Sequence, residues 1–398
     1  MSFKLPSYKD LNQTQKVLIQ LLPKTEKLAV IGGPGTGKTI VGIQGAIQMM
    51  NQGKKCLFLS YSDMLRCFIQ NIAKENNLDI NGIEINTFHT WFWHFIKKEL
   101  DVEDPTEYQP DRPYFYDVNM LLNLINTCGK SPNELIKYDY IFIDEAQDIQ
   151  EGMMKVLIKF TKNILVTFDD SQKIGNEYEN DSKLSYDHSN ILIDLGIGDK
   201  FYDLIENYRN TSQIESIAKS FLSSYNENEV SLMKVTSNKQ GKRPKLIHNL
   251  NNDYKAIVDY IVKHNDKSKS VGVLIGNDDK ELGKTVFDIL EKEFKKTDVK
   301  FLYRYGKRYS NINTSNALSN GIFLMTMKSS KGLEFDEVYL IANNFSIADY
   351  QGRNSLYVAF TRAKENSNII MFDNLEICRE LNKMLSDISY MFANEIME

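Results

Sequence analysis

The sequence is poor in the residues that build disulfide frameworks and metal cages, and it has no long apolar run. Its 398 residues include five histidines and four cysteines, at Cys56, Cys67, Cys128 and Cys378. Because no two cysteines form a Cys-x-x-Cys pair, neither a disulfide scaffold nor a zinc cage is indicated. No apolar run approaches the roughly 18 residues that span a bilayer, and no signal-type apolar segment follows Met1. We therefore expect a cytoplasmic protein that has reduced thiols and does not enter a membrane.

An excess of positive charge is also missing. Lys and Arg total 48 against 53 Asp and Glu, a formal net charge of −5. This excludes a polyanion binder whose affinity comes from bulk charge, but it leaves room for a local basic groove. Hydrophobic residues make up 42% and charged residues 25%, which is ordinary for a globular protein. At about 150 residues per domain, the length predicts two or three domains.

Short apolar runs alternate with segments of helical period along most of the chain. The first runs lie at 28–31, 56–60, 84–88, 140–143 and 164–168, and a polar stretch then extends to about 200. A second series lies at 246–248, 271–275, 299–303, 322–326, 337–341 and 368–372. Such a rhythm predicts α/β architecture with parallel sheets in two lobes, 1–200 and 201–398. From 374 onward the pattern predicts an amphipathic helix.

A phosphate-binding loop follows the first apolar run. The segment Gly32-Gly33-Pro34-Gly35-Thr36-Gly37-Lys38-Thr39 matches G-x-x-x-x-G-K-[ST] and precedes a helical segment at 40–50. The backbone N–H groups of Gly33, Gly35, Thr36 and Gly37 are expected to surround phosphate oxygens at the helix N-terminus. In such loops Lys38 reaches the β- and γ-phosphates, and the hydroxyl of Thr39 is a ligand for Mg²⁺.

Two carboxylates end the run at 140–143. A parallel strand there would deliver Asp144 and Glu145 to the carboxyl edge of the sheet. Asp144 is then a candidate Mg²⁺ ligand with Thr39, and Glu145 a candidate base for an attacking water. Together with Lys38, these residues predict a site for ATP hydrolysis.

The segment Asp144-Glu145-Ala146-Gln147-Asp148 resembles motif II of the UvrD/Rep-like superfamily 1 DNA helicases. Counting it and the phosphate loop, eight motifs of that family occur in the family's order. The others are the Q motif (11–15), the Thr-Phe-His motif (87–90) and motifs III (169–172), IV (207–211), V (326–335) and VI (357–363). The resemblance implies two RecA-like lobes that bind ATP between them.

The resemblance also implies roles for individual residues. Arg209 and Arg362 would stabilise charge on the γ-phosphoryl group in the transition state, and Gln172 would sense the γ-phosphate. Around the nucleoside, Gln15 would read the adenine edge, Tyr208 would stack on the base and Glu334 would hydrogen-bond the ribose.

Nucleic acid would run across the tops of both lobes. By motif position Tyr61, Thr87, His89 and Thr326 are the expected contacts. The aromatic segment 91–95 is more typical of a helix core than of a base platform. The basic and aromatic segment 300–309 fits a nucleic-acid contact and a twisted strand equally well.

Some positions depart from the family pattern. The segment 173–178 lacks the usual aromatic and Arg of the base-stacking platform, Lys328 stands where His is usual, and Phe168 stands where Gly is usual. We expect a small helical insertion near 93–137 in the first lobe and no large insertion in the second. We expect the departures at 173–178, Lys328 and Phe168 to affect the coupling between ATP and DNA more than ATP hydrolysis itself.

The leading interpretation is an ATP-dependent DNA helicase or translocase that moves 3′ to 5′ on single-stranded DNA or from a single/double-strand junction. The alternative is an ATP-gated nucleic-acid-binding sensor that controls a partner such as a nuclease, by analogy with phage-defence systems of the Gabija kind. A P-loop kinase or metabolic NTPase fits less well, because such enzymes have no second lobe with motif arginines. DNA or RNA preference, duplex unwinding, the partner and the oligomeric state stay open.

Overall fold

The computed structural model describes two compact units. They are Lys4–Ile205, called the first lobe below, and Glu206–Glu398, called the second lobe. The described residues are 6–60, 66, 69–70, 80–106, 115–169, 172, 188–198, 200–222, 235–249, 252–276, 280–305, 309–312, 319–342, 350–372, 375–385 and 388–392. None of the helices in these ranges has the length and apolarity needed to cross a membrane.

The first lobe alternates strands and helices. Its strands are β1 (Lys27–Gly32), β2 (Cys56–Ser60), β3 (Ile83–Thr87), β4 (Tyr138–Ile143), β5 (Thr161–Phe168) and β6 (Tyr202–Leu204). Its helices are α1 (Gln13–Leu21), α2 (Lys38–Asn51), α4 (Phe88–Leu100), α5 (Val118–Thr127), α6 (Pro132–Leu135), α7 (Met153–Leu157) and α8 (His188–Leu195). Short 3₁₀ turns η1 (Tyr8–Asp10), η2 (Leu22–Lys24) and η3 (Ala146–Asp148) complete it.

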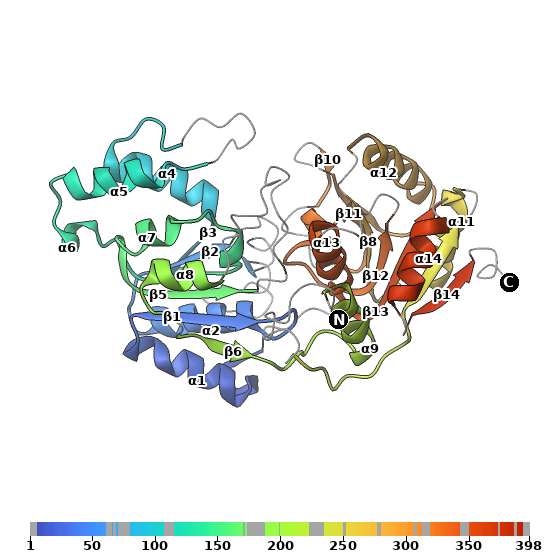
Figure 1. Cartoon of the computed structure of the whole chain (residues 1–398), viewed down its shortest axis with the longest axis horizontal. Coiled ribbons are helices and arrows are strands. Elements are labelled where there is room, and N and C mark those ends of the chain that lie inside the picture. The colour runs from blue at the N-terminus through green and yellow to red at the C-terminus, as the bar shows by residue number, and fades with distance from the viewer. Residues whose placement is uncertain are drawn as a thin grey trace. The chain divides into compact units, whose positions relative to one another are not determined.

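The six strands form one sheet in the order β3-β2-β4-β5-β1-β6, and every neighbouring pair is parallel (Figure 1). All residues of β2 and all but the first of β1 are buried, as expected for a sheet covered on both faces. Since parallel strands end at the same edge, the residues that follow β1, β4 and β5 come together.

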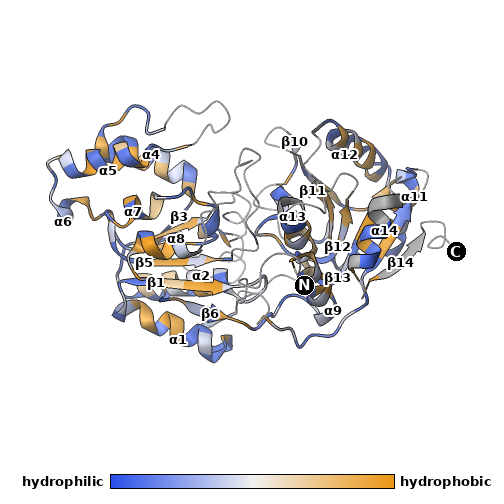
Figure 2. Ribbon diagram, in the orientation of Figure 1, coloured by the Kyte–Doolittle hydropathy of each residue, from blue (hydrophilic) through white to orange (hydrophobic). Residues whose placement is uncertain are grey.

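Helices cover the two faces of this sheet unequally. Helix α2 packs closely on one face, where a Cβ at Gly45 would lie 3.1 Å from the Phe142 ring and 2.7 Å from a methyl group of Leu22. On the other face α4, α5, α7 and α8 share one core with alternate residues of β1, β2, β4 and β5. Figure 2 shows this burial as apolar colouring of β5 and α8.

The second lobe has a larger sheet. Its strands are β7 (Lys245–Asn249), β8 (Ser270–Ile275), β9 (Phe301–Tyr305), β10 (Tyr309–Ser310), β11 (Gly321–Thr326), β12 (Phe335–Ile341), β13 (Ala363–Phe372) and β14 (Ser389–Phe392). Its helices are α9 (Ser212–Leu222), α11 (Tyr254–His264), α12 (Lys280–Phe294), α13 (Tyr350–Phe360), α14 (Leu375–Met384) and the turn η5 (Lys328–Ser330).

The strand order in this sheet is β10-β9-β11-β8-β12-β13-β7-β14. The edge pair β9 and β10 is antiparallel, and the other neighbours are parallel. Helices α11 and α12 share a core with β7, β8, β11, β12 and β13. The α/β fold class with parallel sheets is therefore confirmed in both lobes.

Three details differ from expectation. The prediction that residues from 374 onward form a closing helix is wrong beyond Met384, because β14 follows and pairs in parallel with β7. Strand β6 was not expected, since it is only three residues long. It pairs with β1, so the first lobe continues past residue 200, where the division had been expected.

Candidate functional site

The phosphate loop joins β1 to α2 by a turn that requires glycine. Gly35 and Gly37 adopt φ of +71° and +88°, values that side chains with a Cβ rarely take. The Thr36 hydroxyl donates a 2.8 Å hydrogen bond to the Gly33 carbonyl and closes the turn. Helix α2 begins at Lys38 with Gly37 as its N-cap, so its first backbone N–H groups lack intrahelical partners. This is the geometry of an anion-binding helix N-terminus.

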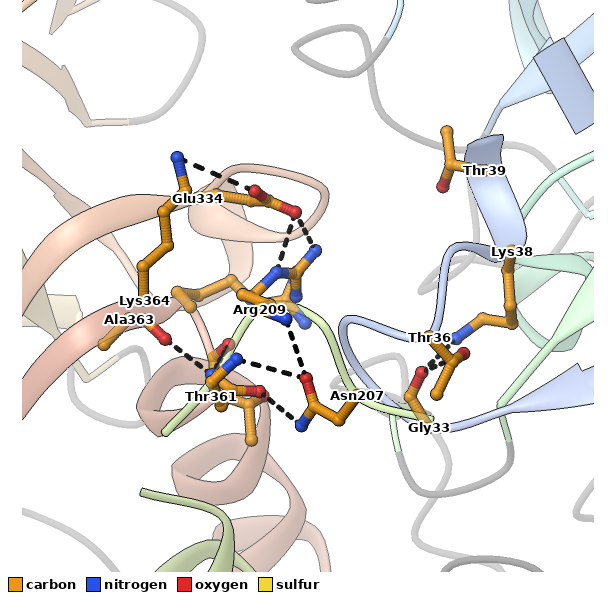
Figure 3. Close-up of polar contacts among 12 residues, drawn as sticks. Gly33, Thr36, Lys38, Thr39, Asn207, Arg209, Glu334, Thr361, Ala363 and Lys364 are labelled. Carbon is orange, nitrogen blue, oxygen red and sulfur yellow. Dashed lines mark hydrogen bonds and ion pairs between the residues drawn. The ribbon is translucent and has the colours of Figure 1, made fainter. Parts of the chain in front are cut away.

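The Lys38 amine lies inside the loop. It donates to the carbonyls of Gly32 at 2.6 Å and Gly33 at 3.0 Å, and it forms a 3.6 Å ion pair with Asp169 at the end of β5. Figure 3 shows the amine directed at the Gly33 carbonyl. Because both Lys38 and Asp169 are buried, this cation is held in a low-dielectric environment, where it acts strongly on a phosphate.

The carboxylate of Asp144 is the centre of the acidic part of the site. Its Oδ2 accepts a 2.6 Å hydrogen bond from the Thr39 hydroxyl, and its Oδ1 accepts one from the Thr167 hydroxyl. Burial, together with the neighbouring carboxylate of Glu145, raises the pKa of Asp144 above its ordinary value. A cation at this position would favour the ionised form and offset both causes.

Glu145 is fixed by an amide network. It adopts a left-handed backbone conformation with φ of +58°, and its Oε2 accepts a 2.5 Å hydrogen bond from Gln147 Nε2. The other end of that amide, Gln147 Oε1, accepts from the Asp169 backbone N–H at 3.1 Å. Gln172 Nε2 donates to Asp169 Oδ2 at 2.7 Å. The carboxylate that follows β4 is thus tied to the residues that follow β5.

Gln15 connects α1 to the phosphate loop. Its Nε2 donates to the Thr36 carbonyl at 3.1 Å, and its Oε1 accepts from the Asn12 backbone N–H at 3.2 Å. A Cβ at Gly37 would lie 2.3 Å from the same Nε2, so a larger residue there would displace the Gln15 amide. Its expected role at the adenine edge stays a prediction.

The second lobe brings two of the expected residues together. Arg209 Nε donates to Glu334 Oε1 at 2.7 Å, and Lys364 lies 3.8 Å from Glu334 Oε2 (Figure 3). Burial alone would raise the pKa of Glu334, but the Arg209 and Lys364 cations outweigh it and hold that pKa below its ordinary value.

Two asparagines position the segment that carries Arg209. Asn207 Oδ1 accepts from the backbone N–H groups of Arg209 at 3.0 Å and Asn210 at 3.1 Å. Asn210 Nδ2 donates to the carbonyls of Thr361 at 2.9 Å and Ala363 at 2.5 Å, on either side of Arg362. The segments 207–211 and 361–363 are therefore bonded to each other.

Arg362 and Tyr208 differ sharply in exposure. The Arg362 side chain is 1% exposed, and its Nε donates to the Val358 carbonyl at 2.9 Å. Tyr208 is 53% exposed, and a Tyr ring at the surface can stack on a base. The roles expected for both residues stay predictions.

The expected nucleic-acid contacts lie at strand ends. Thr87 ends β3 and donates to the Thr90 hydroxyl at 2.9 Å, while His89 lies in the first turn of α4. In the second lobe Thr326 ends β11, and its hydroxyl accepts from the Ser329 backbone N–H at 3.1 Å. Tyr61 and the segment 173–178 lie outside the described residues, so these parts of the prediction are not tested.

The two aromatic segments pack into cores. Trp91 is buried, and its Nε1 donates to the Tyr138 hydroxyl at 3.2 Å, which agrees with the helix-core interpretation of 91–95. In β9, the Phe301 ring stacks on Phe294 of α12, and the Tyr303 ring packs edge-on against Phe287 of the same helix. Residues 306–308 of that segment lie outside the described part of the chain.

Sequence reasoning missed Thr167 and gave no role to Gln147, Asn207 or Asn210. The signal for Thr167 was a lone hydroxyl in the apolar run Ile164-Leu165-Val166-Thr167-Phe168. Because Ile143 pairs with Val166 in the sheet, the next residues, Asp144 and Thr167, are neighbours. The asparagines flank Tyr208 and Arg209 in their motif, but their bonds to 361–363 cannot be read from spacing.

Comparison with known proteins gives two family matches. The model of an AAA domain matches residues 15–176, and the model of the UvrD-like helicase C-terminal domain matches residues 321–370. No curated protein matches the chain. Among solved structures the chain is similar to the C-terminal domain of a possible DNA helicase from Lactobacillus plantarum WCFS1, with 18% identity and a TM-score of 0.32 over 47% of this chain and 98% of that one. The two family matches, each over a different lobe, indicate a UvrD-like DNA helicase that hydrolyses ATP.

Proposed function

We propose that the protein is a translocase that steps 3′ to 5′ along single-stranded DNA and couples each step to hydrolysis of Mg-ATP. The observation that carries this proposal is the arrangement of Lys38, Thr39, Asp144 and Glu145 at one edge of the first sheet. Each of these side chains has a hydrogen-bond or ion-pair partner that fixes it.

Thr39 and Asp144 would hold Mg²⁺. Their oxygens lie 2.6 Å apart, and a hydroxyl with a carboxylate is a ligand pair that Mg²⁺ accepts. Bound there, Mg²⁺ neutralises charge on the phosphate oxygens. The Thr167 hydroxyl donates to the other carboxylate oxygen of Asp144, Oδ1, and so orients the carboxylate, as hydrogen-bond partners of metal ligands commonly do.

Glu145 is the proposed base for the attacking water. Its left-handed backbone turns the residue away from the path of β4, and the hydrogen bond from Gln147 selects one orientation of its carboxylate. A positioned base contributes about 10²- to 10⁴-fold to such a reaction. Gln172 is the proposed sensor of the γ-phosphate, because it shares Asp169 with Lys38.

The second lobe would supply the remaining groups. Arg209 and Arg362 are the proposed cationic stabilisers of the transferring phosphoryl group, a role worth about 10³- to 10⁵-fold in related enzymes. Gln15, Tyr208 and Glu334 are proposed to contact the adenine base and the ribose. Thr87, His89, Thr326 and Tyr61 are the proposed contacts to the DNA strand.

Displacement of streptavidin from end-labelled oligonucleotides tests direction and movement together. A 3′ to 5′ translocase displaces streptavidin from a biotin at the 5′ end and not from one at the 3′ end. Glu145→Gln should abolish displacement. Glu26→Gln is the matched control, because Glu26 is exposed and precedes β1 at the opposite edge of the same sheet.

The same assay separates the alternative function. An ATP-gated sensor that controls a nuclease would displace streptavidin from neither end, although ATP would change its affinity for DNA. Displacement of streptavidin from the 3′ end would contradict the proposed 3′ to 5′ direction, but it would still support ATP-driven translocation.

A further inference from the structure

The ring of Tyr116 is enclosed by the first turns of α4. Tyr116 is fully buried, with its ring edge-on to Phe88 and Phe92 at centroid distances of 6.2 and 4.8 Å. It lies parallel to the His89 imidazole, at 5.9 Å and 16°. The Tyr116 hydroxyl is 3.4 Å from His89 Nδ1 and 3.5 Å from the His89 carbonyl oxygen. These are long hydrogen bonds, so the stacked ring is the stronger constraint on His89.

The backbone of Tyr116 is held by an antiparallel β-bridge to Thr106 and by the side chain of Gln150. Gln150 Oε1 accepts from the Tyr116 N–H at 2.7 Å, and Gln150 Nε2 donates to the Tyr116 carbonyl at 2.8 Å. The Gln150 amide therefore bonds both the N–H and the carbonyl of Tyr116, as the backbone of a neighbouring strand would. It joins Tyr116, two residues before α5, to the segment between η3 and α7.

Gln150 is in turn rigidly connected to Glu145. The turn η3 starts directly after Glu145, and the backbone N–H groups of Asp148 and Ile149 donate to the carbonyls of Glu145 and Ala146 at 3.0 and 3.1 Å. Ala146, Gln147 and Ile149 are buried against the core. A displacement of Gln150 is therefore transmitted to Glu145 through a short, closed segment.

We propose that Tyr116 and Gln150 are positioning residues that couple DNA contact at His89 to the orientation of Glu145. A strand that moves His89 shifts the stacked Tyr116 ring, Tyr116 shifts the Gln150 amide, and Gln150 shifts η3 with the carboxylate that begins it. The inference rests on the proposed function, since it assumes that DNA contacts His89 and that Glu145 is the base. It adds a mechanical link between them within the first lobe.

The test is ATP turnover as a function of single-stranded oligonucleotide concentration in Gln150→Leu, Tyr116→Leu and Tyr116→Phe. We expect Gln150→Leu to lower maximal stimulation by about fivefold or more while the half-stimulating DNA concentration changes little, because the Gln150 amide bonds to the Tyr116 backbone and is not a proposed DNA contact. Tyr116→Leu should lower stimulation and also raise that concentration. Tyr116→Phe keeps the stacked ring and should resemble the parent.

Tyr140→Phe is the matched control. It removes a buried hydroxyl that donates to the Leu22 carbonyl at 3.3 Å. The Tyr140 ring stacks on Phe142, on the face of the sheet that α2 covers, so it lies outside the contacts of Tyr116 and Gln150, and its loss should leave stimulation unchanged. Thermal unfolding of every variant identifies loss of fold. If Gln150→Leu does not fold, Gln150→Glu replaces it, because Glu keeps the acceptor for the Tyr116 N–H and loses the donor to its carbonyl.

The outcomes separate the two proposals. A stimulated parent whose folded Gln150 variant is stimulated equally would overturn the coupling and leave the proposed function intact. A parent that ignores single strands would overturn both. Equal loss of stimulation in Tyr140→Phe would also count against the coupling, because it would show a general effect of losing a buried polar group of the first lobe.

Discussion

Arg209 and Glu334, 125 residues apart in the chain, form a charge-assisted hydrogen bond of 2.7 Å between Nε and Oε1. Both side chains are mostly buried, at 14% and 16% exposure, and Lys364 lies on the other carboxylate oxygen. The motif residues expected at the γ-phosphate and at the ribose are thus bonded to each other in the second lobe. A contact with ATP through Arg209 Nε or Glu334 Oε1 would compete with this pair.

The Arg209 and Glu334 pair predicts a pH-dependent stability. Because the folded-state pKa of Glu334 is lowered, its contribution is fully present above its ordinary pKa of about 4.5 and is lost as the pH falls through the lowered value. Glu334→Gln should cost about 1.5–3 kcal/mol at pH 7. Urea unfolding of the parent and of Glu334→Gln at pH 7 and pH 3.5 measures this cost. A difference in unfolding free energy that is larger at pH 3.5 than at pH 7 would contradict the lowered pKa of Glu334.

Thr167→Val tests the support of the candidate Mg²⁺ site. Valine has nearly the same shape but cannot donate to Asp144 Oδ1, so the carboxylate loses one of its two hydroxyl partners. The Mg²⁺ concentration for half-maximal ATP turnover should rise by about tenfold or more.

Thr161→Val is the control for this change. Thr161 begins the same strand β5, and its hydroxyl donates to backbone carbonyls at 3.0 and 3.3 Å. A similar rise in the Mg²⁺ requirement in both variants would show that loss of any buried threonine hydroxyl of β5 is sufficient.

Gly37→Ala should weaken ATP binding severely. The added Cβ meets φ of +88° and lies 2.3 Å from Gln15 Nε2, so both the loop and the Gln15 contact must shift. Gly53→Ala is the control, because Gly53 has φ of +77° and nothing within 4 Å of its Cβ position. Calorimetric titration with an ATP analogue should show at least about tenfold weaker binding for Gly37→Ala, whereas Gly53→Ala should cost only about 1 kcal/mol of stability. Equal affinity for the ATP analogue in both variants would contradict the requirement for glycine at position 37.

Much of the fold follows from local pattern. Runs of three to five residues, mostly apolar, alternate with helical segments, and in a parallel sheet this places Lys38, Asp144 and Asp169 at one edge. Strand β14 could not be predicted, because its pairing with β7 is made across more than a hundred residues and its four residues carry a weak signal. Contacts between loops far apart in the chain could not be predicted either, because local pattern carries no signal for them.

The site was predictable as a set of residue types but not as a network. Motif order identified Arg209 and Glu334 separately, and neither spacing nor periodicity indicates that they pair. Tyr116 and Gln150 lie in no recognised motif, and their contact joins residues 34 positions apart in the chain. Side-chain amides that bond to a distant backbone leave no periodic trace in a sequence.

The most direct test of the account is steady-state ATP turnover with and without single-stranded DNA, at low salt because phosphate contacts weaken steeply with salt. The account predicts strong stimulation by DNA in the parent and in Glu26→Gln, and a loss of about 10²- to 10⁴-fold in Glu145→Gln. Turnover that is unchanged by single strands, or that survives in Glu145→Gln, would contradict a DNA-coupled motor whose base is Glu145.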